Sequence, residues 1–311
     1  MLCYKCLKKI PDRSSRCPHC GQVFTGKPAS QSTGDRGAPL KEDDIVGHYS
    51  IRELVGEGPL GRVYKVLDKQ FDIIAAIKIL HPDFSRDRSI RNTTQNTFRS
   101  LSEFDSERFV KVYDAGEDKE RVFIATDFLE GLSLRRLMEV RAPMGGRFRF
   151  EEAEPIIEAV CEALEELTPG EVHGDIKPEN IQILPDSVKL TDLGLTRIMD
   201  PAAFVAAQVL AGNAYLAPEL AGAAERIRTD PAVDVFAVGT LMYQLLTGKL
   251  PDEDSINPCT AVPETPAAVG KLVERALQAH PDRRYGHVAE LHLDLAHLAK
   301  RNERRPRSRS T

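Results

Sequence analysis

Two nearby segments of the sequence combine acidic, amide and lysine side chains in a pattern that could do chemistry. The string HGDIKPEN at residues 173–180 places Asp175, Lys177 and Asn180 in one loop, and Asp192 follows twelve residues after Asn180. A nucleoside triphosphate with magnesium requires carboxylate and amide oxygens for the metal, a cation for the phosphate charge, and a base near the acceptor hydroxyl. These side chains supply all three, which favours phosphoryl transfer.

A glycine-rich string lies earlier, between two predicted strands. Gly56, Gly58 and Gly61 belong to GEGPLGRV, and a glycine backbone can approach phosphate oxygens closely because no Cβ intervenes. The G-x-G-x-x-G pattern alone usually marks a turn. Since it joins two strands and does not open a helix, it disfavours a dinucleotide-binding βαβ unit. Lys78 follows in the third predicted strand, where a lysine within an apolar run needs an anionic partner.

The elements that must position these residues change in type along the chain. Runs of β-branched or alternating residues predict strands in the first part, at 49–55, 62–68, 72–80, 109–116 and 121–128. Later segments have helical periodicity, at 151–167, 231–248, 263–279 and 286–300. A strand-rich part followed by a helix-rich part predicts an α+β protein of two lobes with a ligand cleft between them.

Composition excludes several classes of protein. With 41% hydrophobic and 29% charged residues, the chain has the balance of a soluble globular protein. No apolar run approaches the ~18 residues of a membrane-spanning helix, and the start lacks a signal-peptide core, so we expect a cytoplasmic protein without a membrane span. The net charge of −5 combines an acidic body with basic ends, which makes a nucleic-acid partner unexpected.

Four cysteines near the amino terminus form two Cys-x-x-Cys pairs. Two such pairs can complete a tetrahedral sulfur shell for zinc, and in a cytosolic chain this outweighs the alternatives of a redox dithiol pair or disulfides. A four-sulfur site has no open position, so the zinc would be structural. The segment 1–24 resembles a short zinc ribbon, whose folding energy the metal would supply. The predicted zinc ligands are Cys3, Cys6, Cys17 and Cys20.

Boundaries follow from composition. Residues 25–44 are rich in Gly, Ser, Pro and Asp and predict a flexible linker. A globular pattern covers 45–298, and the basic tail 299–311 is expected to be a solvated end, with a docking segment as the alternative. Four histidines without metal-like partners are expected at the surface or in helices, namely His81, His280, His287 and His292.

Further motifs follow in the order typical of one family. The string Ala-Pro-Glu at 217–219 resembles the end of an activation segment, Asp234 and Gly239 match the helix after it, and Arg284 matches a late arginine that pairs with that glutamate. Over 45–298 the chain resembles a eukaryotic-type serine/threonine protein kinase of the bacterial kind. The resemblance implies a bilobal protein-kinase-like fold, with a strand-rich lobe at 45–127 and a helical lobe at 132–298.

The resemblance also implies roles for individual residues and the ligands ATP and Mg²⁺. Residues expected to bind the nucleotide are the three glycines over the phosphates, the adenine neighbour, the phosphate-binding lysine and the backbone of the hinge that follows Thr126: Gly56, Gly58, Gly61, Val63, Lys78, Asp127 and Leu129. In the catalytic loop, Asp175 would accept the proton of the substrate hydroxyl and Lys177 would neutralise the γ-phosphate. Asn180 and Asp192 would hold magnesium. His173 would brace the loop. Protein substrates are the expected partners, together with a possible protein partner of the zinc ribbon.

The sequence departs from the family beside Lys78. The glutamate that pairs with this lysine should come from the next helix, but counting places Thr97 there. Three alternatives follow: Glu103 substitutes through a shifted helix, Lys78 pairs with Asp192, or the site is impaired. The last alternative would make the chain a pseudokinase, a nucleotide-binding scaffold with little phosphotransfer. A small-molecule kinase is disfavoured by the complete Ala-Pro-Glu segment.

A second group of departures concerns activation. The family's arginine before the catalytic aspartate, which grips a phosphate on the activation loop, is Gly174 in this chain. Between Gly194 and the Ala-Pro-Glu string the only hydroxyls belong to Thr196 and Tyr215. Both the grip and its usual target are therefore missing, which predicts activation without loop phosphorylation. A milder departure is Asn213, at the position of a threonine that bridges the catalytic aspartate and lysine.

Overall fold

The computed structural model describes Pro18 and residues 37–252 and 255–303. The described chain divides into two compact units. The first runs to Glu130 and also includes Asp192–Asn213, and the second consists of Gly131–Thr191 and the chain from Ala214 onward.

An antiparallel sheet forms most of the first unit. Its strands lie in the order β1 (Ile45–Val46), β2 (Tyr49–Glu57), β3 (Gly61–Asp68), β4 (Ile73–Leu80), β6 (Arg121–Asp127) and β5 (Val112–Asp118). The five strands predicted from alternation are confirmed. Alternate side chains such as Tyr64 and Val66 on β3, and Ile77 and Ile79 on β4, pack into one buried cluster. Lys78, between the last two, therefore points away from that cluster.

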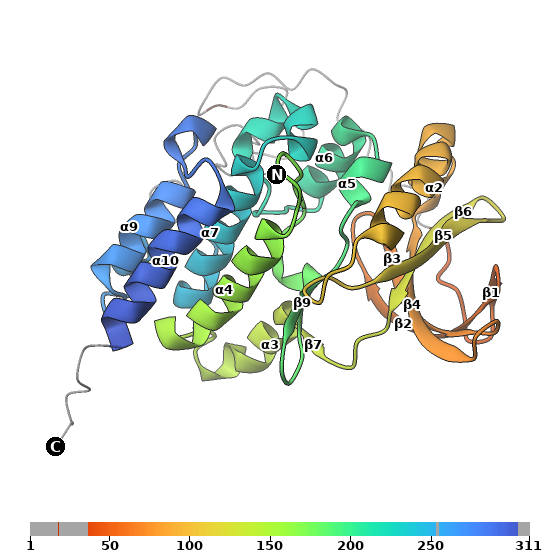
Figure 1. Ribbon diagram of the computed structural model, residues 1–311, viewed down its shortest axis with the longest axis horizontal. Helices are drawn as coiled ribbons and strands as arrows, with labels where there is room; N and C mark the ends of the chain where they lie inside the picture. Colours follow the sequence, from red (N-terminus) through yellow and green to blue (C-terminus); the bar gives the residue numbers. More distant parts are fainter. Residues whose placement is uncertain (1–17, 19–36, 253–254, 304–311) are drawn as a thin grey trace. The chain divides into compact units, whose positions relative to one another are not determined.

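Helices complete the first unit. After α1 (Pro82–Ser85), helix α2 (Arg88–Glu103) packs along β5 (Figure 1). The side chain of Asp87 caps α2 by accepting a hydrogen bond from the amide of Ser89. The segment Asp192–Asn213, called the returning segment below, forms α5 (Leu195–Ile198), which contacts α2, and then α6 (Pro201–Leu210).

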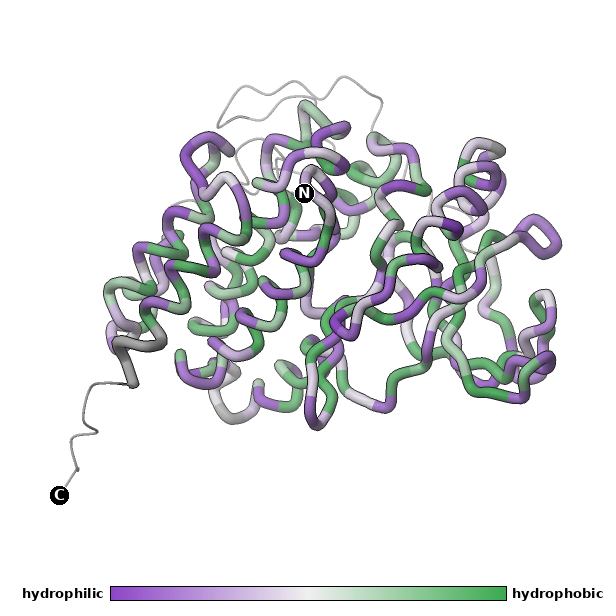
Figure 2. The backbone as a smooth tube through the Cα atoms, in the orientation of Figure 1, coloured by the Kyte–Doolittle hydropathy of each residue, from purple (hydrophilic) through white to green (hydrophobic). Residues whose placement is uncertain are grey.

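The second unit is mainly helical. Its long helices α4 (Phe150–Glu165), α7 (Ala232–Thr247), α9 (Ala267–Ala276) and α10 (Val288–Glu303) pack together, and the predicted helical segments are confirmed (Figure 1). Every residue from Ala232 to Leu246 is buried, which makes α7 the centre of this core. In contrast, apolar and polar residues alternate along α9 and α10 (Figure 2). Gly248 caps the end of helix α7, and its φ of 73° is the left-handed conformation that glycine adopts freely.

Short elements surround the loop that carries the acidic and amide residues. A small sheet is made of β7 (Leu132–Ser133), β8 (Ile181–Ile183) and β9 (Val188–Leu190), and strands β8 and β9 directly follow the loop. The remaining helices of the second unit are α3 (Leu134–Arg141) and α8 (Pro258–Ala261), with the 3-10 helices η1 (Ala142–Met144), η2 (Pro178–Asn180), η3 (Pro218–Ala221), η4 (Ala224–Arg228) and η5 (Pro281–Arg283).

Candidate active site

The glycine-rich string connects β2 and β3 in the first unit. The amide of Gly58 donates to the carbonyl of Gly61 at 2.9 Å, which closes the turn. A Cβ on Gly61 would lie 2.2 Å from the carbonyl oxygen of Ile79, so only glycine fits there. A Cβ on Gly56 would meet no protein atom within 4 Å, and one on Gly58 only the Gly61 oxygen at 4.0 Å. The protein thus leaves room beside the first two glycines.

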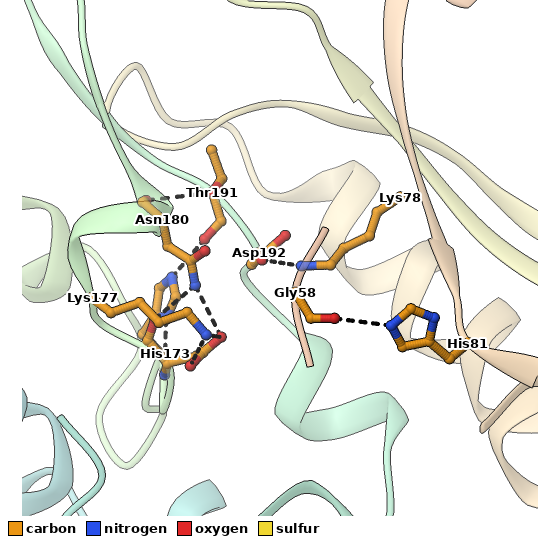
Figure 3. Close-up of polar contacts among 9 residues, drawn as sticks. Gly58, Lys78, His81, His173, Lys177, Asn180, Thr191 and Asp192 are labelled. Atoms are coloured by element: carbon orange, nitrogen blue, oxygen red, sulfur yellow. Dashed lines mark hydrogen bonds and ion pairs between the residues drawn. The ribbon is translucent and has the colours of Figure 1, made fainter. Parts of the chain in front are cut away.

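Lys78 forms an ion pair with Asp192 (Figure 3). Asp192 is the residue at which the chain re-enters the first unit. Their side chains are only 16% and 15% exposed, so each charge needs the other. Asp192 adopts a φ of 66°, a left-handed conformation that is uncommon for a residue with a side chain. Of the three alternatives drawn from the sequence, the pairing of Lys78 with Asp192 is the one observed.

Helix α2 supplies no carboxylate at the position counted from the sequence. Thr97 lies on α2 and is buried, and its methyl carbon is 3.3 Å from the place where a Cβ on Gly194 would be. Leu101, one turn later, is closer still at 2.6 Å. The glycine after Asp192 therefore lets the returning segment approach α2 closely. Glu103 is exposed at the carboxyl end of α2.

The remaining residues of the first unit predicted to contact a nucleotide lie on the same sheet or directly after it. Val63 on β3 is directly opposite Lys78 on β4, so the two side chains share one face. Strand β6 ends at Asp127, which is exposed and whose amide donates to the carbonyl of Lys111 at 3.2 Å. Leu129 follows and is partly buried.

In the second unit, two of the predicted residues donate hydrogen bonds to the carboxylate of a third. Lys177 donates from Nζ to both oxygens of Asp175 at 2.7 Å. The amide of Asn180 donates to the Asp175 carbonyl at 2.8 Å and to its Oδ2 at 3.0 Å. Asp175 and Asn180 are each only 4% exposed. The carboxylate is thus held in one orientation by an ammonium and an amide.

A network of buried hydrogen bonds stabilises the loop that carries Asp175. Two amides, those of His173 and Gly174, donate to the carboxylate of Asp234 at 2.8 and 2.9 Å, and burial raises the pKa of Asp234. The ring of His173 accepts from the Asp175 amide through Nδ1 at 3.2 Å and donates through Nε2 to Thr191 O at 2.9 Å. These two contacts fix the orientation of the His173 ring between the backbone of Asp175 and that of Thr191.

Gly174 has a φ of 75°, where a side chain would be strained. The backbone conformation of the loop therefore suits the glycine that replaces the family's arginine.

Several predicted features lie outside these two groups. The four cysteines Cys3, Cys6, Cys17 and Cys20 fall outside the described residues. Within the described part, no group of three His, Cys, Asp or Glu side chains could hold a metal ion. None of the helices described is long and apolar enough to cross a membrane. Asn213 donates to Gln208 on α6 at 3.0 Å.

Comparisons with known proteins identify the family. The sequence profile described as the protein kinase domain matches residues 49–292. The chain belongs to the protein kinase family. It is 29% identical over 281 residues to the serine/threonine-protein kinase PknL of Mycobacterium tuberculosis, covering 84% of this chain and 68% of PknL. It is 26% identical to the serine/threonine-protein kinase PrkC of Bacillus subtilis, covering 81% of this chain but only 40% of PrkC.

The solved structures support the same bilobal fold. The kinase domain of M. tuberculosis PknI superposes with a TM-score of 0.70 at 24% identity, covering 84% of this chain and all of that domain. Family, relatives and fold agree that this is a bacterial-type serine/threonine protein kinase domain, with a strand-rich and a helical lobe.

Two features of the kinase were not predicted from the sequence. The segment after Gly194 forms helix α6, although its apolar and alanine-rich sequence shows no clear helical stripe. The expectation for His81 was wrong in placing it at the surface: it is 5% exposed and contacts the glycine-rich loop. The alternating pattern of β4 ends at Leu80. This strand end was the one sequence signal that His81, the next residue, could contact the glycine-rich loop.

Proposed function

We propose that this kinase transfers the γ-phosphoryl group of ATP to serine or threonine hydroxyls of protein substrates, with Asp175 as the base. The observation that carries this proposal is the Asp175 carboxylate, oriented by Lys177 and Asn180. A carboxylate can accept about four hydrogen bonds, so it can serve more donors than these two. Lys177 would also reduce the negative charge around the transferred phosphoryl group.

The residues of the first unit fit a nucleotide. The open space beside Gly56 and Gly58 would let phosphate oxygens approach the backbone, as a side chain would not. Lys78 would contact the α- and β-phosphates, and Val63, on the same face, would pack against adenine. The hinge from Asp127 to Leu129 would hydrogen-bond the base through its backbone.

Asn180 and Asp192 are the proposed ligands of Mg²⁺, a hard cation that prefers oxygen ligands. When bound, magnesium would offset the charge of the phosphates. The pairing with Asp192 gives Lys78 a carboxylate partner that α2 lacks, which supports activity and not the pseudokinase alternative. The PknL and PrkC relatives, both serine/threonine-protein kinases, support it too.

Titration calorimetry of the purified chain with ATP tests the nucleotide part of the proposal. We expect ATP to bind in the presence of Mg²⁺ and to bind more weakly when the metal is chelated. Failure to retain ATP at millimolar concentration with Mg²⁺ present would overturn the proposal.

Activation is proposed to proceed without phosphorylation of the segment between Gly194 and Ala217. Its two hydroxyl residues support this, since Thr196 is 1% exposed and Tyr215 is also buried. Phosphatase treatment of the active protein is expected to leave its transfer rate undiminished. A rate that collapses on treatment and returns only with phosphate on Thr196 would contradict this prediction.

The amino-terminal segment 1–24 is proposed to be a structural zinc ribbon that recruits a protein partner. Its support is the spacing of two Cys-x-x-Cys pairs. Thiolate ligands need a reducing compartment, so this proposal also includes the expected cytoplasmic location. Metal analysis is expected to find one equivalent of zinc, retained in Cys259→Ser and lost in Cys20→Ser. Zinc absent from the wild type, or retained in Cys20→Ser, would contradict the assignment.

A further inference from the structure

His81 is a buried residue at the point where strand β4 ends. The family motifs give His81 no role in binding nucleotide or substrate. It is nevertheless only 5% exposed, while His280, in the second unit, is exposed. A buried imidazole needs hydrogen-bond partners, and those partners show what the residue does.

Two hydrogen bonds join His81 to the glycine-rich loop, which precedes it by about twenty residues. Its ring Nε2 is 2.9 Å from the carbonyl oxygen of Gly58 (Figure 3), and its backbone amide donates to the carbonyl of Leu60 at 2.9 Å. A carbonyl oxygen can only accept, so Nε2 carries the proton and donates. Both neutral and protonated imidazole can make this bond.

His81 is itself held firmly by the rest of the first unit. Its carbonyl accepts from the amides of Phe84 and Ser85 at 2.9 and 3.0 Å, in the first turn of α1. The hydroxyl of Ser85 donates to the carbonyl of Leu80 and accepts from the amide of Val122 on β6, each at 3.1 Å. The imidazole therefore projects from a backbone fixed to two strands of the sheet.

Other contacts of the glycine-rich loop involve its base and Leu60. At the base, Arg62 pairs with Glu57 at 3.1 Å, and Leu60, within the turn itself, is buried. At Gly58 the backbone amide is used within the loop, so the bond to His81 is the contact that ties this glycine's carbonyl to β4. The same strand carries Lys78, three residues before His81. Lys78 on β4 and His81 directly after it are thus held by the same stretch of backbone.

We propose that His81 is a positioning residue for the triphosphate: its imidazole holds Gly58 so that the glycine-rich loop keeps its place relative to Lys78. This inference rests on the proposed ATP site. It predicts a loss of affinity confined to ligands that carry phosphates, because adenine and ribose do not depend on the loop tip. A merely structural role would weaken adenosine and nucleotide alike.

The test compares wild type with His81→Ala, His81→Asn and His81→Gln, using adenosine and a non-hydrolysable ATP analogue with Mg²⁺ as probes. The Gln amide can reach the place of Nε2 and donate, whereas Asn is too short. Loss of one hydrogen bond predicts affinity for the analogue about 2–10-fold lower in the Ala and Asn variants, recovery in Gln, and unchanged adenosine affinity. The KM for ATP should rise with little change in kcat. His280→Ala is the matched control and should bind both probes like wild type.

The outcomes separate this inference from the proposed function. If wild type binds the analogue no better than adenosine, the ATP site itself fails and the inference with it. If wild type shows the preference and the Asn and Gln variants both keep it, His81 does not position the loop. Equal losses for both probes would also overturn the inference. Should His81→Ala fail to fold, the comparison of Asn with Gln still decides.

Discussion

Asp175→Asn is expected to lower the rate of phosphoryl transfer about 10²–10⁴-fold, the usual contribution of a positioned general base. The amide is nearly isosteric with the carboxylate and can still accept from Asn180, so the loop keeps its shape. It cannot take up a proton from the substrate hydroxyl, and it removes the anionic partner of Lys177. Single-turnover measurement with Mg·ATP and a generic protein substrate gives the rate.

Two controls make this result specific to Asp175. Asp186→Asn removes a carboxylate from the exposed turn between β8 and β9 and should transfer at the wild-type rate. ATP affinity of the Asp175→Asn variant should stay close to wild type, since the change is aimed at the acceptor side. A variant that transfers as fast as wild type would show that Asp175 is not the base.

Glu219→Ala is expected to reduce the free energy of unfolding by about 3–5 kcal/mol, because it leaves the buried charge of Arg284 without its anionic partner. The guanidinium of Arg284 is 0% exposed and binds both oxygens of Glu219, at 2.8 and 2.7 Å. It also donates to the backbone carbonyls of Ala232, Gln278 and Ala279, but carbonyls cannot neutralise its charge. Denaturant unfolding followed by circular dichroism measures the loss.

Matched variants test the cause of that loss. Glu139→Ala removes the partner of an exposed pair with Arg136 and should change stability by less than about 1 kcal/mol. Replacing Glu219 and Arg284 together by leucine and methionine should recover part of the stability, because no unpaired charge is left buried. A loss for Glu219→Ala as small as that for Glu139→Ala would contradict the account.

The sequence predicted those parts of the fold that depend on local patterns. Burial alternates along β3 and β4 and is continuous along the apolar run of α7, and both patterns can be read from neighbouring residues. The catalytic loop could be assembled from sequence because Asp175, Lys177 and Asn180 lie within six residues. Their contacts need only one turn to form.

Contacts between distant residues could not be settled in this way. The partner of Lys78 lies 114 positions away, so the sequence left three alternatives open, and only the fold brings Asp192 to the lysine. His81 was misplaced for a related reason, since a hydrogen bond to a carbonyl 23 residues earlier leaves no trace in a hydrophobic pattern. Helix α6 was missed because its sequence has too few polar residues to define a face.

Activity without a glutamate from α2 is the central claim, and product analysis tests it most directly. Wild-type protein incubated with Mg²⁺, γ-labelled ATP and a generic protein substrate is expected to place label on serine and threonine of that substrate. If the protein binds Mg·ATP but the label stays in the nucleotide, the pairing of Lys78 with Asp192 does not sustain catalysis and the chain is a pseudokinase.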